Sequence, residues 1–329
     1  MILARAPLRI SLGGGGTDLP SYYSEFGGFI LSAAINKYVY IYVNRPAADQ
    51  LLRIKYSKYE QVEHADQVQH DLVRPALQML GLHDNVEVVS MADVPDGTGL
   101  GSSGSYLVAL LAALYDLTRH RVSTQALAEA ACHIEMNLAQ HPVGKHDHYL
   151  AAFGGLTVLD IDTSGAVGVS ALDISRSTLE ELKSQTLLFY TGIRRSSTEI
   201  LAEQVSDTRE RKTAVVDSLH ETKEIGFRIR EALEHGDLDC YGRLLDRHWQ
   251  NKKRRSGKIS DPNIEKWYVL GKDSGALGGK IVGAGGGGFL MLCCPPEYKA
   301  GVRAALGSQG LREMPYEFDF EGAKVMVNF

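Results

Sequence analysis

Apolar residues recur at every second position in several short stretches of the chain. Between residues 29 and 43, tyrosines at 38, 40 and 42 alternate with β-branched residues. This period of two is typical of a strand with two differently packed faces. Similar stretches predict further strands over 2–12, 86–91, 155–161, 187–190, 280–282, 289–293 and 324–327.

A second set of segments has the helical period. Leu107, Leu110, Leu111 and Leu114 fall on one face of a helix predicted over 103–117. Further helices are predicted over 71–80, 124–138, most of 197–249, and after the Pro295-Pro296 pair. Strands dominate the first half and helices the second, so we place a domain boundary near residue 184, giving domains 1–184 and 185–329.

The segment 95–105 reads Pro-Asp-Gly-Thr-Gly-Leu-Gly-Ser-Ser-Gly-Ser and leads directly into the helix predicted over 103–117. Its glycines can adopt backbone conformations that turn amide groups inward around an anion. The helix that follows adds free N–H groups and the positive end of its dipole. Ser102 and Ser103 stand where they can cap the helix, and a hydroxyl there can also reach a phosphate-bound magnesium ion. The pattern predicts a polyphosphate cradle, although its spacing is that of neither a Walker A nor a dinucleotide-binding motif.

Two other glycine clusters join strand-like residues to flexible backbone. One is Gly13 to Gly16, followed by Thr17-Asp18, and the other lies within 283–288. Three separate clusters of this kind suggest that distant segments converge where backbone must approach a ligand.

In order and spacing, these three segments resemble the three motifs of the GHMP small-molecule kinases. The resemblance implies an α+β fold with a mixed-sheet N-terminal domain, a ferredoxin-like C-terminal domain and an active site between them. It also implies ATP and Mg²⁺. The residues expected to contact ATP are Pro95, Gly97, Gly99, Leu100, Gly101, Ser102, Ser103 and Gly104.

The segment 135–147 carries the expected chemistry. Pro142 and Gly144 predict a turn after the preceding helix, from which Asp147 would project into a cleft rather than join a helix surface. By the resemblance, Asp147 activates the acceptor hydroxyl, Arg9 supplies a cation near the γ-phosphate, and Glu135 and Ser103 lie near magnesium. The nearby His141, His146 and His148 are not expected to form a metal site.

Galactokinases of this family carry Gly-Glu-His before the Thr-Asp pair, whereas this chain has Gly14-Gly15-Gly16. The glycine run and the loop 144–148 resemble instead the branch that phosphorylates the anomeric hydroxyl of D-glycero-D-manno-heptose 7-phosphate, giving the 1,7-bisphosphate for nucleotide-activated heptose synthesis. The residues expected to contact the sugar are Gly14, Gly15, Thr17, Asp18, Lys145, Gly285 and Gly286.

A phosphorylated acceptor needs a second anion site, away from ATP. Arg194, Arg195 and Ser196 combine cations, a hydroxyl and a predicted helix start, which suits a phosphate monoester. The basic run 252–255 is the less favoured alternative, because a charge run is usually a solvated face.

Other readings remain open at this point. An anomeric kinase of an unphosphorylated sugar such as fucose, a GHMP-type decarboxylase and a non-catalytic sugar and ATP sensor share the fold, although Thr17-Asp18 argues against the decarboxylase. The net charge of −5 gives no attraction to nucleic acid. The four cysteines form no C-x-x-C pattern, and no apolar run reaches the length of a membrane span, so we expect a cytoplasmic protein. We expect it to be a monomer or a homodimer.

Overall fold

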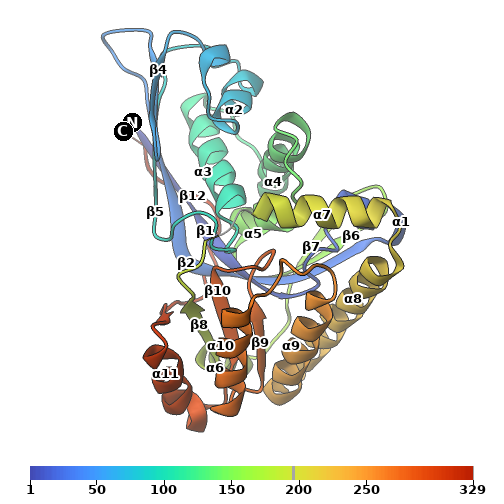
Figure 1. Ribbon diagram of the computed structural model, residues 1–329. Helices are drawn as coiled ribbons and strands as arrows, with labels where there is room; N and C mark the ends of the chain where they lie inside the picture. Colours follow the sequence, from blue (N-terminus) through green and yellow to red (C-terminus); the bar gives the residue numbers. More distant parts are fainter. Residues whose placement is uncertain (195–196, 329) are drawn as a thin grey trace.

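The strands assemble into two sheets, which lie one above the other in Figure 1. The computed structural model describes residues 1–194 and 197–328. The first sheet contains β1 (Ile2–Gly13), β2 (Gly28–Asn44), β3 (Leu52–Lys55), β4 (Tyr59–Val62), β5 (Glu87–Ala92), β6 (Leu156–Ile161), β7 (Val167–Ala171) and β12 (Lys324–Asn328). The second contains β8 (Thr186–Tyr190), β9 (Gly278–Ile281), β10 (Phe289–Cys293) and β11 (Arg312–Glu313).

The long strand β2 organises the first sheet. Its first half pairs with β6 and its second half with β5, while β1 runs along its other edge. The order is β12-β1-β2-β5-β3-β4, with every pair antiparallel except β3 and β5. Pro7 has no N–H for the ladder, and the register of β1 on β2 shifts immediately after it. The mixed sheet expected for the first half is therefore present.

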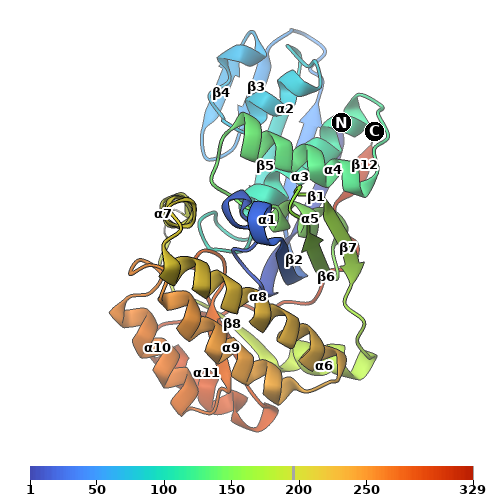
Figure 2. The same ribbon diagram turned by 90° about the vertical axis from the view of Figure 1, so that its right-hand side faces the viewer.

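Helices fill the space around both sheets (Figure 2). They are α1 (Pro20–Phe26), α2 (Val73–Met79), α3 (Ser102–Leu117), α4 (Thr124–Cys132), α5 (His146–Phe153), α6 (Arg176–Gln185), α7 (Ser197–Arg209), α8 (Thr213–Glu234), α9 (Leu238–Lys253), α10 (Pro262–Asp273) and α11 (Lys299–Ser308), with the short turns η1 (Ala65–Gln67) and η3 (Pro296–Tyr298). The helix predicted over 124–138 continues beyond α4 as the π-helical segment η2 (His133–Leu138).

The second sheet is antiparallel, in the order β11-β8-β10-β9, and is buried on both faces. Leu188 and Met291 belong to the large core that also contains Leu8 and Ile10 of β1. Leu187 and Leu290 point to the other face, into a smaller core with Trp249. Alternate residues of each strand thus pack into two different cores. Because both faces are buried, the sequences of β8 and β10 are continuously apolar.

The boundary proposed near residue 184 falls at the end of α6, between the two sheets. One segment does not follow that division: β12 pairs with β1, so the last part of the chain returns to the first sheet. The isolated pairing of Ile35 with Phe318 adds to this return. The last strand of the proposed domain 185–329 therefore belongs to the sheet of the N-terminal half.

Candidate functional site

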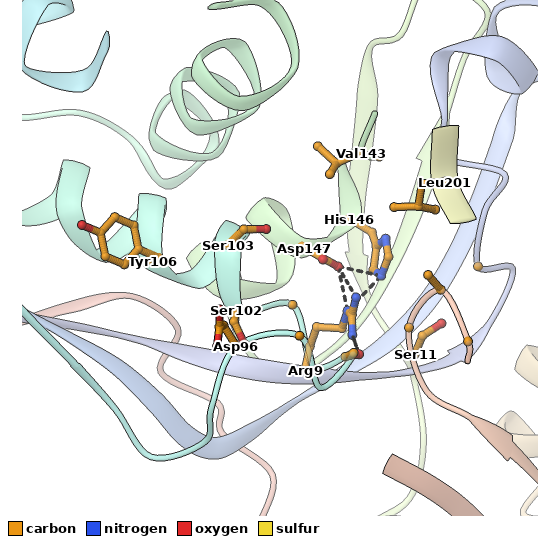
Figure 3. A pocket seen from close by; sticks show the side chains of 18 of the residues that line it. Arg9, Ser11, Asp96, Ser102, Ser103, Tyr106, Val143, His146, Asp147 and Leu201 are labelled. Carbon is orange, nitrogen blue, oxygen red and sulfur yellow. Dashed lines mark hydrogen bonds and ion pairs between the residues drawn. The ribbon is translucent and has the colours of Figure 1, made fainter. Parts of the chain in front are cut away.

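A cavity of about 420 Å³ lies where the two halves meet, and all three glycine clusters line it. Gly15 and Gly16 follow β1, the second cluster precedes α3, and Gly283, Gly285 and Gly287 connect β9 to β10. The helix α7 contributes Leu201 and Gln204 to the wall (Figure 3). The convergence expected from the sequence is therefore present in the structure.

The second glycine cluster forms a left-handed turn at the mouth of α3. Gly97, Gly99 and Gly101 have φ values of 69°, 80° and 80°. A Cβ atom at Gly99 would lie 2.4 Å from the carbonyl oxygen of Val282, so this turn also needs glycine to pass the third cluster. Backbone amides can point into the cavity here because no side chains block them.

Neither serine caps α3, contrary to the expectation. Gly101 occupies the N-cap position with no side-chain hydrogen bond, and Ser102 and Ser103 are the first two residues of the helix. The Ser102 hydroxyl lines the cavity and is buried without a hydrogen-bond partner among the described residues. A buried hydroxyl in this position fits a phosphate oxygen as its missing partner.

The cavity becomes aromatic and apolar beyond the helix mouth. The rings of His70 and Tyr106 stack with centroids 5.1 Å apart and planes 10° from parallel. Leu72, Met91 and Val94 complete this end of the wall. A planar, partly apolar group such as a nucleobase fits such a lining.

Arg9, His146 and Asp147 converge in the middle of the cavity (Figure 3). The carboxylate oxygen Oδ1 of Asp147 lies 2.6 Å from Nη2 of Arg9 and 2.8 Å from Nε2 of His146. Nδ1 of His146 lies 2.7 Å from Oδ2 of Asp18. One imidazole therefore connects the first glycine motif to the candidate base.

Asp147 does not project from a turn as predicted; it is the second residue of α5. The Pro142 and Gly144 turn ends just before this helix, and Asp147 sits in its first turn. A carboxylate is favoured there because the first N–H groups of the helix carry positive partial charge.

Burial alone would raise the pKa of Asp147, but the charges of Arg9 and His146 outweigh it and hold that pKa well below its usual range. Burial lowers the pKa of His146, whereas the carboxylates of Asp147 and Asp18 raise it to about 9. The pKa of Asp18 is likewise lowered, because His146 outweighs the effect of burial. At neutral pH the imidazolium form of His146 is therefore favoured between two ionised aspartates, and its Nε2 atom also lies 2.9 Å from Nε of Arg9.

Glu135 lies on η2 and is almost completely buried. Its Oε2 atom lies 2.7 Å from Nε2 of His148, and its Oε1 atom 3.4 Å from Nδ1 of His141. Burial raises the pKa of Glu135, but hydrogen bonds from His141, His148 and Ser103 lower it to about 2. The carboxylate is therefore charged and in contact with the Ser103 hydroxyl at the start of α3.

An ionised carboxylate beside a hydroxyl fits Mg²⁺, which takes oxygen ligands and is commonly held by one or two protein groups together with phosphates. Within residues 1–194 and 197–328, no group of three or more His, Cys, Asp or Glu side chains would hold a metal by itself. An ion at Ser103 and Glu135 would therefore depend on nucleotide phosphates for its remaining ligands.

Not every residue expected at the nucleotide lines the cavity. Leu100 is buried, and its carbonyl accepts the N–H of Arg9. Pro95 accepts a hydrogen bond from Thr98. Gly104 faces Asp147, and a Cβ atom there would lie 2.7 Å from Cβ of that residue. These three residues shape the site from behind.

The residues expected at the sugar divide in the same way. Gly15, Asp18 and Gly285 line the cavity, whereas Gly14, Thr17 and Gly286 do not. Thr17 is buried, and its hydroxyl donates to the carbonyls of Gly14 or Phe29 and accepts the N–H of Phe29. Its role is to fold the loop that presents Asp18.

Two of the basic residues expected to contact the acceptor, Lys145 and Arg194, have partners away from the cavity. Lys145 donates to the carbonyl of Gly165, and Arg194 pairs with Asp96 at the surface. Neither lines the cavity. Arg195 and Ser196, the other two residues of that prediction, lie outside the described residues.

Several cavity residues were missed by the sequence analysis or set aside in it. His146 was considered only as a metal ligand, a role that was not expected for it, and Gln204 was not singled out. Lys252 and Arg255 were ranked second as an anion site, yet both line the cavity. The basic run 252–255 was the only indication of Lys252 and Arg255 in the sequence. Nothing in the sequence shows that these two of its four residues are buried.

Comparison with known proteins agrees with this geometry. The GHMP kinases N terminal domain matches residues 65–155, and the GHMP kinases C terminal domain matches residues 229–311. The chain is 27% identical to D-glycero-alpha-D-manno-heptose 7-phosphate kinase of Campylobacter jejuni, over 98% of each protein. It is 28% identical to L-fucokinase/L-fucose-1-P guanylyltransferase of Bacteroides fragilis, over 93% of this chain but 36% of that longer protein.

Solved structures give the same picture. A crystal structure of a D-glycero-D-manno-heptose 1-phosphate kinase from Bacteroides thetaiotaomicron superposes with a TM-score of 0.83 at 25% identity, covering 100% of both chains. Lactococcus lactis galactokinase, complexed with galactose, superposes with a TM-score of 0.78 at 15% identity, covering 98% of this chain and 94% of that one, which shows the shared fold. Within the described residues, no helix combines the length and the apolar character needed to cross a membrane.

Proposed function

The chain belongs to the GHMP kinases and is a sugar kinase that uses ATP, and from that premise we propose that its acceptor is the anomeric hydroxyl of D-glycero-alpha-D-manno-heptose 7-phosphate. The product would be the 1,7-bisphosphate. The likeness to a heptose 7-phosphate kinase over the whole length of both proteins supports this acceptor.

The observation that carries the proposal is the asymmetric setting of the Asp147 carboxylate. Its Oδ1 atom is held by Arg9 and His146, while its Oδ2 atom has no hydrogen-bond donor among the described residues and lies at the edge of Gly101, 3.3 Å from where a Cβ atom would be. One oxygen fixes the orientation, and the other is left for the acceptor. Gly101 precedes α3, so the free oxygen faces the end of the phosphate cradle.

In the transfer step, the anomeric oxygen forms a bond to the γ-phosphorus, and the bond from that phosphorus to the β,γ-bridging oxygen breaks. ADP leaves, and the hydroxyl proton passes to Oδ2 of Asp147. Phosphoryl transfer has a loose transition state, so positioning and charge contribute more than a strong base. Arg9, only 4% exposed, provides a fixed positive charge beside the reacting groups.

An anomeric acceptor suits an ionised Asp147. Arg9 and His146 hold the pKa of this carboxyl below its usual range, so a hydroxyl that gives up its proton readily is the better match. The anomeric hydroxyl of a sugar is more acidic than its other hydroxyls, because the ring oxygen withdraws electrons from the same carbon. Bound Mg²⁺, held by Ser103, Glu135 and the nucleotide, would neutralise charge on the phosphates.

The proposal is tested by ATP turnover with heptose 7-phosphate, with phosphorus NMR to identify the product and Asp147→Asn for comparison. We expect a new anomeric phosphate, and a loss of kcat of about a hundredfold to ten-thousandfold in the variant. An ordinary ester phosphate in the product, or an Asp147→Asn variant as active as the parent, would refute the assignment.

Two alternatives are decided by the same assay. The similarity to a fucokinase region favours L-fucose as the second sugar to include. Turnover with fucose alone would retain the anomeric chemistry and replace the acceptor. Sugar binding without ADP formation would identify a sensor instead of an enzyme.

A further inference from the structure

Three cations are buried together behind the sugar side of the cavity. Lys252, Arg255 and Lys280 are 6%, 6% and 2% exposed. None of them forms an ion pair with a carboxylate within residues 1–194 and 197–328, although buried charges in proteins are normally paired. Burial, together with neighbouring cations, lowers the pKa of Lys252, and it lowers that of Lys280 to about 7. Arg255 therefore keeps its positive charge without a carboxylate partner, while burial shifts the two lysines toward their neutral forms until an anion binds beside them.

Two of these cations reach the cavity with donors to spare. Arg255 donates through Nε to Ser218, through Nη2 to Thr222 and through Nη1 to the carbonyl of Gly15. A guanidinium has five N–H donors, so these three bonds leave part of its fork free. Nζ of Lys252 donates to the carbonyls of Ile281 and Gly283, 3.2 and 2.5 Å away, which leaves one of its three donors.

The contacts of Arg255 place its free donors on the acceptor side of the site, and Lys252 reaches the cavity beside Gly283 of the third glycine cluster. Arg255 holds Gly15, and a Cβ atom at Gly16 would lie 3.1 Å from its Nη1 atom. The same glycine run leads to Asp18, the partner of His146. Ser11, 5% exposed, lines this wall, and its hydroxyl is buried without a partner among the described residues. The nucleotide end, by contrast, is formed by Ser102 and the stacked rings of His70, which precedes α2, and Tyr106, which lies on α3.

We propose that Lys252 and Arg255, with the hydroxyl of Ser11, form the binding site for the phosphate monoester of the acceptor sugar. This inference rests on the proposed function, since it assigns the residues that recognise the acceptor's own phosphate. In heptose 7-phosphate that group is on the exocyclic carbons, away from the anomeric carbon that Asp147 faces. A dianionic phosphate would supply the missing counter-charge and accept the free donors.

The test compares heptose 7-phosphate with the same heptose lacking its phosphate, in the parent enzyme and in Arg255→Gln. We expect the variant to raise KM for heptose 7-phosphate by about 10- to 100-fold, the loss that follows from one hydrogen bond between charged groups. The kcat/KM for the unphosphorylated heptose should fall far less than that for heptose 7-phosphate, because only the second sugar loses a phosphate contact, and the KM for ATP should stay within about twofold. Lys252→Met should act in the same direction.

Arg254→Gln is the matched control, because Arg254 is the adjacent residue but is exposed and paired with Glu221. It should leave all three parameters unchanged. Arg255→Lys should recover part of the affinity for heptose 7-phosphate, because lysine restores the positive charge but not the paired N–H donors of the guanidinium. Circular dichroism melting of each variant verifies that it is folded before kinetics are compared.

Three results would overturn the inference: an equal loss for both sugars, a selective rise in KM for ATP, or no effect of Arg255→Gln on a folded enzyme. If the parent enzyme does not turn over heptose 7-phosphate, the proposed function fails by itself. Calorimetric titration with inorganic phosphate then tests the site directly, with the nucleotide site filled by a non-hydrolysable ATP analogue. Binding that disappears in Arg255→Gln supports the site, and equal binding in both proteins, or none in either, refutes it.

Discussion

His146 is the residue on which the arrangement of charges in the site depends. It lies between two carboxylates that would otherwise repel each other and contacts both. When the imidazolium loses a proton, its remaining N–H can serve only one of them. If that N–H stays on Nδ1 toward Asp18, Oδ1 of Asp147 is oriented by Arg9 alone. The charge state of His146 should therefore control both the geometry of the base and the acceptor loop.

The first prediction concerns pH. The pKa of His146 is raised to about 9 in the folded protein, above the value of about 6.5 for a free histidine. Its contribution to stability is therefore fully present below about pH 6.5 and is lost as the pH rises through about 9. We expect kcat/KM to fall over the same alkaline range. A profile from pH 6 to 10.5 should show this limb in the parent enzyme and not in His146→Gln.

His235, an exposed histidine that follows α8, provides the control. His235→Gln should keep the alkaline limb. If His146→Gln keeps it too, another group is responsible for the pH dependence.

At the residue scale, the sequence predicted the groups that belong to recognisable motifs and missed those that act through burial. Arg9 and Ser103 stand beside glycine clusters, and Asp147 belongs to the segment 135–147 that carries the family resemblance, so their place could be inferred. Lys252 and Arg255 belong to a basic run that looks solvated. Lys252 is interior because α9 packs against β9, and Arg255 is interior because it contacts Ser218 and Thr222 of α8.

At the scale of elements, the site depends on the close approach of α3 and α5. Gly104 of α3 faces the start of α5, where Asp147 lies. A Cβ atom at Gly104 would lie 2.7 Å from Cβ and 2.9 Å from the backbone carbon of Asp147. These are rigid parts of a helix, so a side chain at position 104 must push the two helices apart.

The second prediction follows from this contact. Gly104→Ala should reduce kcat by about 10- to 100-fold, because a displacement of about 1 Å of a catalytic group can cost a hundredfold. Its KM for ATP should change less, since the glycines of the cradle are untouched. Steady-state kinetics with both substrates varied would measure this split.

Gly307→Ala is the control, because Gly307 lies in α11 with open space around it. Alanine is the better helix former, so this change should be neutral or stabilise the protein by up to about 1 kcal/mol. An unaltered kcat in Gly104→Ala would show that Asp147 tolerates the shift.

Long, strongly periodic elements were predicted and short or polar ones were not. The segments β1, β2, α3 and β10 match the sequence expectations within one or two residues. The strands β3, β4 and β7 and the helices α5, α6 and α10 were missed, because their patterns are brief or interrupted by charges. No serine caps α3 because Gly101, in a left-handed conformation, occupies the N-cap position. Residue propensities alone do not predict that conformation.

At the scale of the whole molecule, one hydrophobic core crosses the boundary that composition suggested near residue 184. The same cluster contains Leu8 and Ile10 of β1, Leu188 of β8, Ile225 of α8 and Met291 of β10. Separate domains would each have their own core and few contacts between them. The sequence could not reveal this continuity, since it depends on contacts between residues far apart in the chain.

The third prediction is that the two halves unfold together. Differential scanning calorimetry of the protein without ligands should give a single transition, with the calorimetric and van't Hoff enthalpies equal. Two resolved transitions would mean that the shared core contributes little. Residues 1–184 produced alone should not give a cooperative melt.

The pairing of β12 with β1 has a consequence for synthesis of the protein. β1 is synthesised long before β12, its neighbour on that edge, so the edge stays open while the chain between them is made. An unpaired edge invites association with other nascent chains. Arg5, which later pairs with Glu321, places a charge on this edge during that interval. The same arginine would thus protect the growing chain from aggregation before it helps to anchor the finished sheet.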